Sequence, residues 1–169
     1  FSQDILQIAT DPIAGFRVMR PRVAILGRHH DGTLRDISIN PHLPTDDRVI
    51  VFRFDGQLFF ANTSYFEDSI LAAVSTKPEA SHILIVGDGI NRLDASGEEV
   101  IHHVVERMRK NGCVVMFSGL KKQVLDVMRR TRLFDQVGGD RNIFPDEYMA
   151  LTVIYQQLND AHHQPLLNG

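Results

Sequence analysis

Short apolar runs of strand length alternate with longer amphipathic stretches through most of the chain. Compact runs of Val, Ile, Leu, Met and Phe lie at 22–28, 49–54, 82–87 and 113–117, and near-continuous apolar character is typical of strands covered on both faces. Between these runs, apolar residues at spacings of three and four predict helices. Strands joined by helices favour parallel pairing through right-handed crossovers, and therefore an α/β fold.

Four helices are predicted from apolar stripes and from signals at their ends. Ser64 and Glu67 have the spacing of a capping box, and Pro78 ends the stripe that follows. Gly112 stops the second helix, and Pro145 fits the first position of the last one. The stripes consist of Phe66, Ile70, Ala73 and Val74; Val100, Ile101, Val104, Val105 and Met108; Leu120, Val124, Val127 and Met128; and Tyr148, Leu151, Ile154, Tyr155 and Leu158.

The remaining segments predict turns and connections. Asp55-Gly56 suits a type I′ turn, so a tight hairpin or a sharp strand break is expected between 49–54 and 57–61. Residues 29–48 carry few apolar positions and predict a long loop. An edge strand is expected at 142–144. These elements predict a central mixed β-sheet of about five or six strands with four to five helices.

The two ends of the chain show weaker patterns. Residues 1–20 have no sustained helical or strand period and predict a connecting segment. The tail from Asp160 to the end is expected to fray. The chain begins at Phe1 without a signal-peptide pattern, so we expect that something upstream has been removed or left out.

Composition narrows the class of protein. The 169 residues are enough for one domain and carry 18 basic against 21 acidic side chains, a net charge of −3. This balance disfavours nucleic-acid binding, because no basic stripe follows the chain. No apolar run approaches the roughly 18 residues that a membrane span needs. Cys113 is the single cysteine, which rules out an internal disulfide and suits a reducing cytosol.

Residues that could carry chemistry are few. The adjacent histidine pairs, such as His102 and His103, cannot reach one metal ion from one helix, so no metal site is expected. Cys113 has no activating base nearby in the sequence. Gly87-Asp88-Gly89 follows a strand, but Arg92 stands where a dinucleotide fingerprint needs glycine. With no nucleophile elbow and no carboxylate pair expected in one cleft, the sequence predicts neither an enzyme nor a bound cofactor.

One segment, Leu93 to Glu99, stands out between a strand run and the second helix. Ser96 and Glu99 have capping-box spacing, and Asp94 lies beside the positive end of the helix. The simplest interpretation is a well-capped helix. The alternative is a functional turn formed by Asp94, Ala95, Ser96 and Gly97.

The order of these segments resembles the STAS domain of SulP-type anion transporters over roughly residues 21 to 155. The similarity rests on PRVAILGR, on VIVFRFDGQLFFAN, on the Asp-x-Ser-Gly turn and on RLFDQVGGDRNIFPDEYMAL. Bacterial anti-sigma factor antagonists share the turn and the fold. The first two blocks favour the transporter branch.

The resemblance implies a cytoplasmic domain at the C-terminal end of a membrane protein that carries sulfate or another inorganic anion. Residues 1–20 would be the linker from the membrane region, 21–158 the STAS domain and 159–169 a flexible tail. Such a domain acts in regulation, trafficking or protein interaction and not in catalysis. Its partners would be the transmembrane part of the same transporter and a cytoplasmic protein, with a homodimer also open.

Ala95 departs from the antagonist pattern. In that branch the residue after the Asp of the turn is the phosphorylated Ser, and Ala95 has no hydroxyl to accept a phosphate. This disfavours, without removing, the alternative of a stand-alone partner-switching module. A third hypothesis is a nucleotide or anion bound at the N–H groups of the helix start, which the charge of Asp94 opposes.

Overall fold

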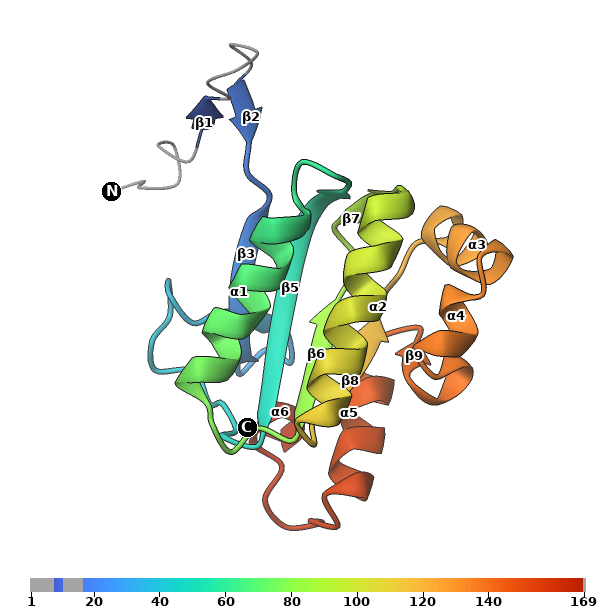
Figure 1. The fold of residues 1–169 in the computed structure, drawn as a ribbon. Coiled ribbons are helices and arrows are strands. Elements are labelled where there is room, and N and C mark those ends of the chain that lie inside the picture. The colour runs from blue at the N-terminus through green and yellow to red at the C-terminus, as the bar shows by residue number, and fades with distance from the viewer. Residues whose placement is uncertain (1–7, 11–16, 169) are drawn as a thin grey trace.

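The computed structural model describes residues 8–10 and 17–168. Its main sheet has seven strands in the order β4-β3-β5-β6-β8-β9, with β7 paired to the far end of β5 (Figure 1). Strands β5 to β9 run parallel to one another, and β3 and β4 are antiparallel to their neighbours. The strands are β3 (Arg22–Arg28), β4 (Leu34–Asp36), β5 (Val49–Leu58), β6 (His82–Val86), β7 (Ile90–Leu93), β8 (Val114–Ser118) and β9 (Ile143–Phe144).

Helices cover both faces of this sheet. One face packs against α1 (Thr63–Thr76), α2 (Ala95–Lys110), α3 (Lys122–Arg130) and α4 (Leu133–Gln136); the other packs against α5 (Glu147–Gln157) and α6 (Pro165–Asn168). A 3-10 turn, Gly139–Arg141, precedes β9. Along β5, Ile50, Phe52 and Phe54 enter the first core and Val49 and Val51 the second, as the two-residue period of a strand requires. No helix within the described residues is both long and apolar enough to span a bilayer.

The predicted mixed α/β fold is confirmed, including the first strand at 22–28, the buried strands at 82–87 and 113–117 and the edge strand near 143. The strand β6 is buried at all five positions, which explains the apolar run from Ile83 to Val86. The buried ring of His82, at its start, forms a hydrogen bond with Gln157. The helical stripes are also confirmed for the most part. Tyr148 is an exception, because it is 66% exposed.

The hairpin predicted at Asp55-Gly56 is wrong, because β5 runs through this pair without a break. Asp55 lies opposite Arg22 of β3, and the Gly56 N–H donates to the Gly89 carbonyl at 2.9 Å. Pairing on both edges outweighs the local turn preference. The partner beyond Gly56 is β7, a strand that the sequence did not predict, since only its two end residues are buried.

Both capping boxes are also wrong. Asn62 and Asp94 precede α1 and α2, so Ser64 and Ser96 lie inside the first turns. Likewise Asp146 caps α5 by accepting a hydrogen bond from the Met149 N–H at 2.8 Å, and Pro145 lies before the cap. The residue immediately before each helix takes the cap position: Asn62, Asp94 or Asp146. The capping-box spacing of Ser64 with Glu67 and of Ser96 with Glu99 is therefore incidental.

Three segments differ from the expected loops. The 29–48 loop contains β4, which pairs with β3. Within residues 1–20, the strands β1 (Ile8–Thr10) and β2 (Arg17–Met19) pair antiparallel, while the other positions of the proposed linker up to residue 16 lie outside the described residues. The end of the chain, expected to fray, folds into α6, where Leu166 and Leu167 are buried against the sheet.

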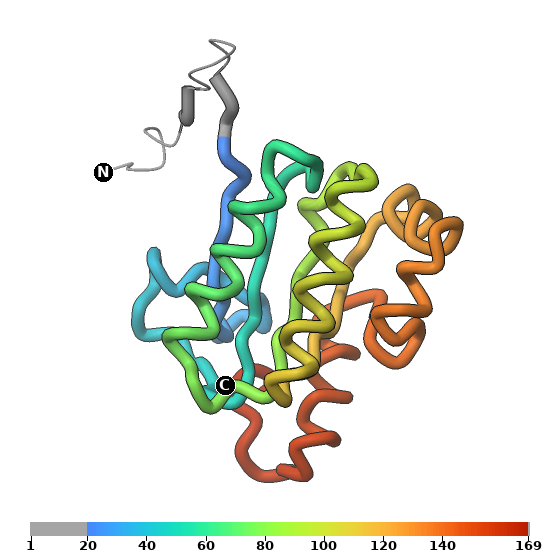
Figure 2. Tube along the Cα trace, viewed as in Figure 1, coloured from blue at the N-terminus to red at the C-terminus, as the bar shows by residue number. Residues whose placement is uncertain are grey.

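A polar clasp holds this C-terminal segment, which Figure 2 shows returning toward the start of β5. Arg48 donates to Asp46 and to Asp160, each at 2.8 Å. The buried Asp46 also accepts from the Tyr155 hydroxyl at 3.1 Å, and that hydroxyl accepts from the Leu166 N–H at 3.3 Å. We call these four side chains, Asp46, Arg48, Tyr155 and Asp160, the clasp.

The clasp predicts acid sensitivity. The backbone N–H of His163 and the Arg48 side chain lower the pKa of Asp160 to about 2 from its ordinary 3.8. Burial alone would raise the pKa of Asp46, but hydrogen bonds from Arg48 and Tyr155 hold it below its ordinary value. Groups whose pKa falls on folding stabilise the fold above their unfolded pKa and lose that contribution as the pH falls.

The free energy of unfolding is therefore expected to fall as the pH drops through about 4 toward about 2. Denaturant titrations across this range measure it. The variant Asp160→Asn should show a shallower fall over the same range. A pH dependence equal to that of the unmodified chain would show that Asp160 does not contribute.

Candidate functional site

The Asp94 carboxylate joins two separate elements at one end of the sheet. Its Oδ1 accepts a hydrogen bond from the Gly97 N–H at 2.8 Å, which caps α2. Its Oδ2 accepts from the Phe60 N–H at 3.1 Å, in the loop that follows β5. The Asp94 N–H in turn donates to the Leu58 carbonyl at 3.3 Å. One side chain thus fixes the helix start against the end of the central strand.

Gly97 allows this close approach. A Cβ built at Gly97 would lie 2.3 Å from the Leu58 carbonyl oxygen and 2.8 Å from Leu93 Cδ1. The first of these atoms is backbone and cannot rotate away. The residue is therefore glycine because the first turn of α2 touches the end of β5, and not because the helix needs flexibility here.

Ala95 and Ser96 lie on the outer side of the turn. Ala95 is exposed, and Ser96 is half-buried at the second position of α2. The Ser96 hydroxyl does not cap the helix, since the Asp94 carboxylate does so. The structure therefore brings the four predicted residues together as a rigid turn in which Asp94 and Gly97 set the shape and Ala95 is the outward-facing side chain.

An aromatic residue that the sequence analysis did not single out borders this turn. The Phe60 side chain is 73% exposed, and its ring meets the Phe59 ring edge-on at a centroid distance of 5.4 Å. The Asp94 carboxylate fixes the Phe60 backbone, and the exposed ring is available to contact another surface. The sequence gives no signal that Phe60 is exposed, because this residue continues an apolar run of strand type.

The chain approaches the domain at this same end (Figure 1). Pro21, just before β3, packs beside Gly56, where an added Cβ would lie 2.8 Å from the Pro21 Cβ. Gly56 is two residues from Leu58, the strand end that binds Asp94. The turn thus lies close to the point where the preceding segment meets the sheet.

No group of metal ligands is formed in the part of the chain that the structure describes. None of its His, Cys, Asp and Glu side chains form a group of three that could hold an ion. Burial raises the pKa of Cys113 to about 11, so the thiolate form is disfavoured at neutral pH. Asp88 and Glu147 do share a hollow beside α5, contrary to the expectation of no carboxylate pair in one cleft. Burial, followed by the charge of Asp88, raises the pKa of Glu147.

Replacing Asp94 by Ala should destabilise the domain by about 1 to 2 kcal/mol, because the change removes the helix cap and frees the Phe60 N–H. Thermal or denaturant unfolding measures the loss. Asp146→Ala is the matched control, since it removes a cap that has no second bond of this kind. Equal losses in the two variants would show that the bond to Phe60 contributes nothing.

Comparison with known proteins places the chain in a family. The sequence model of the STAS domain family matches residues 40–150 of this chain. Among curated proteins, the putative sulfate transporter YvdB of Bacillus subtilis (strain 168) is 24% identical over 134 residues, which are 79% of this chain and 24% of YvdB. The chain therefore spans about a quarter of the length of this relative.

Solved structures share the fold. The murine Slc26a9 anion transporter in its inward-facing state superimposes with a TM-score of 0.70 at 17% identity, covering 82% of this chain and 22% of that one. The STAS domain of a SulP transporter from Vibrio cholerae has a TM-score of 0.58 at 18% identity, covering 73% of this chain and 93% of that domain. At these identities the likeness establishes the fold.

Proposed function

This chain belongs to the STAS domain family, and from this premise we propose that it is the cytoplasmic, C-terminal domain of a SulP-type inorganic anion permease, with sulfate as the leading substrate. Its role is regulation, trafficking or protein interaction and not catalysis. The observation that carries the proposal is the match to the family over 40–150 together with the similarity to YvdB, whose name describes a sulfate transporter.

The geometry supports a particular orientation. The turn at Asp94, the exposed Phe60 and the start of β3 share one end of the domain. In the proposed permease, residues 1–20 link this end to the membrane region and 21–158 form the regulatory domain. The turn and Phe60 then face the transmembrane part, and the clasp holds the segment from Asp160 to Asn168 away from it.

The alternative is a stand-alone module that resembles anti-sigma factor antagonists. Ala95 argues against its phosphorylation switch, because the exposed position of the turn carries no hydroxyl. Ser96 keeps a hydroxyl but is half-buried. Incubation with a cognate kinase followed by intact-mass measurement tests this alternative, and a gain of one phosphate at Ser96 would favour it over the permease proposal.

Membrane fractionation of the intact gene product tests the proposal first. An integral membrane protein several times the mass of this chain is expected, as the share of YvdB that the chain covers suggests. A product of about this size that stays out of the membrane fraction would contradict the permease assignment.

Anion uptake by the intact protein tests the role of the domain. Phe60→Ala should lower sulfate uptake at equal membrane abundance, because it removes an exposed contact at the proposed transmembrane-facing end. Tyr148→Ala is the matched control, since Tyr148 is an equally exposed aromatic residue on the α5 side of the sheet. Uptake that neither variant changes would count against the orientation proposed for the turn.

A further inference from the structure

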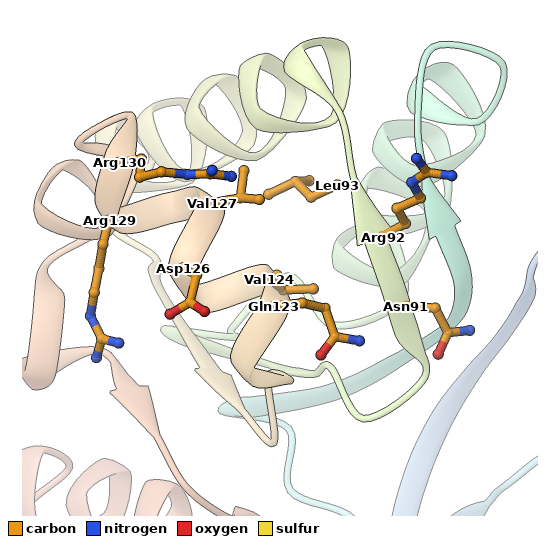
Figure 3. Close-up of a pocket in the computed structure, with 9 residues that line it drawn as sticks. All are labelled: Asn91, Arg92, Leu93, Gln123, Val124, Asp126, Val127, Arg129 and Arg130. Carbon is orange, nitrogen blue, oxygen red and sulfur yellow. The ribbon is translucent and has the colours of Figure 1, made fainter.

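A groove between strand β7 and helix α3 lies beside the Asp94 turn but is not part of it (Figure 3). Its floor is apolar and consists of Leu93 from β7 and Val124 and Val127 from α3. At one end, the Lys121 ammonium donates to the Asn91 side-chain oxygen, which ties the start of α3 to β7. This contact joins the two elements at one end of the groove.

The rim of this groove carries positive charge. Arg92 on β7 and Arg130 on α3 are both exposed. Figure 3 shows the Arg130 side chain extending toward Leu93, whereas the Arg92 side chain leaves β7 on the side away from α3. None of the ion pairs formed by residues 17–168 includes either guanidinium. Arg129 points away from Arg130, with its Cζ 4.7 Å from the centre of the Phe134 ring.

The groove contains little negative charge of its own. Asp126 is the one carboxylate among its lining residues, and the Lys122 ammonium already binds it at 2.6 Å. The whole chain has a net charge of −3, so the positive rim is a local feature and not a reflection of overall composition. Among the described residues neither guanidinium takes part in an ion pair, so Arg130 beside the apolar floor and Arg92 on the outer edge of β7 are both available to an outside ligand.

These features define the chemistry of an occupant. Guanidinium groups bind carboxylates with paired hydrogen bonds, and arginines at the edge of an apolar patch are common centres of binding energy. An amphipathic helix placed in a groove buries its apolar stripe and leaves its flanks at the rim. We propose that the β7–α3 groove binds an acidic amphipathic segment of a partner protein, with apolar side chains on the floor and carboxylates on Arg92 and Arg130.

The shape favours a protein segment over other anionic partners. The floor residues lie below the rim, so a flat membrane surface would meet only the arginines and leave the apolar floor uncovered. A second copy of the chain would need an acidic apolar ridge of matching length. The inference goes beyond the proposed function, because it rests on the groove alone and stands or falls without the permease assignment.

Peptide selection tests the proposal directly. The complete 169-residue chain is used as bait for a random library of peptides about 16 residues long, enough for four to five helical turns. Selected peptides should carry a net negative charge, with apolar residues at spacings of three and four. No selected peptide, or peptides that are neutral or basic, would overturn the proposal.

Fluorescence anisotropy with the tightest synthetic peptide then locates its site. Arg92→Glu and Arg130→Glu should each weaken binding by about tenfold or more, and rising salt should weaken it further. Lys110→Glu, an equal change of charge at the exposed far end of α2, should leave the affinity within about twofold. Equal loss in all three variants would overturn the groove as the site, leaving only a general charge effect.

Two further measurements separate the other occupants. Flotation with phosphatidylserine vesicles, and sedimentation of the chain alone, are each made with the unmodified chain and with Arg130→Glu. Neither vesicle binding nor self-association should depend on Arg130. A vesicle complex or a dimer that this variant abolishes, in the absence of peptide binding, would overturn the proposal in favour of a membrane or a second copy.

Discussion

Gly97→Ala is expected to destabilise the domain by about 3 kcal/mol, although Ala ordinarily favours a helix over Gly by about 1 kcal/mol. The added Cβ would lie 2.3 Å from the Leu58 carbonyl oxygen. Relief requires α2 to move away from β5, which stretches the hydrogen bond from the Asp94 N–H to that same oxygen. Denaturant unfolding monitored by circular dichroism measures the change.

Glu99→Ala is the matched control, because it places the same side chain at an exposed position one turn into α2. Its effect should stay within about 0.5 kcal/mol. If Gly97→Ala were as stable as this control, the close contact between α2 and β5 would be absent in solution, and the turn would owe its shape to the Asp94 cap alone.

Arg48→Ala is the second large effect, an expected loss of about 3 kcal/mol. Removing one partner of a buried ion pair leaves the other charge without compensation, and the Asp46 side chain is only 3% exposed. The partial exposure of Arg48 itself, 29%, keeps the value at the lower end for such pairs. The same change cuts the bond to Asp160, so α6 should detach more readily from the sheet.

Two measurements separate these effects. Unfolding titrations give the overall loss, and limited proteolysis reports cleavage between Asp160 and Pro165, which should become faster. Arg35→Ala removes an exposed pair with Asp31 and should cost less than about 1 kcal/mol. If Arg48→Ala lowered the free energy of unfolding no more than Arg35→Ala does, water would be solvating the Asp46 charge in place of Arg48. The clasp would then not hold the C-terminal segment.

The parts of the fold that followed from sequence are those in which one physical effect dominates. The strand β6 is buried on both faces, so the run from Ile83 to Val86 is apolar throughout, and the pattern could be recognised without knowing any neighbour. The stripe of α2 from Val100 to Met108 was equally clear, because one face alone meets the core.

The missed elements depend on pairing between distant segments. β7 exists because Ile90 and Leu93 lie beside the end of β5, and its two middle residues are exposed, so its own sequence has no strand period. Asp55-Gly56 has the composition of a turn but is held extended by neighbours on both edges. Local preference could not reveal either result.

The candidate site likewise contains residues that the sequence predicts and contacts that it does not predict. The four residues of the Asp94 turn could be named from spacing and from the family resemblance, but the bond from Asp94 to the Phe60 N–H joins positions 34 residues apart. The Arg92–Arg130 rim likewise unites a strand and a helix that are separate in sequence. Charges that meet only in the folded chain leave no signal in either segment.

The shared carboxylate of Asp94 has a dynamic consequence. One oxygen holds the first turn of α2 and the other holds the loop after β5, so opening of either segment weakens the restraint on its neighbour. A ligand that stabilises the loop at Phe60 must therefore stabilise the helix start by an equal coupling free energy. Slower hydrogen exchange at the Gly97 amide would report binding at Phe60, even though no ligand touches Gly97.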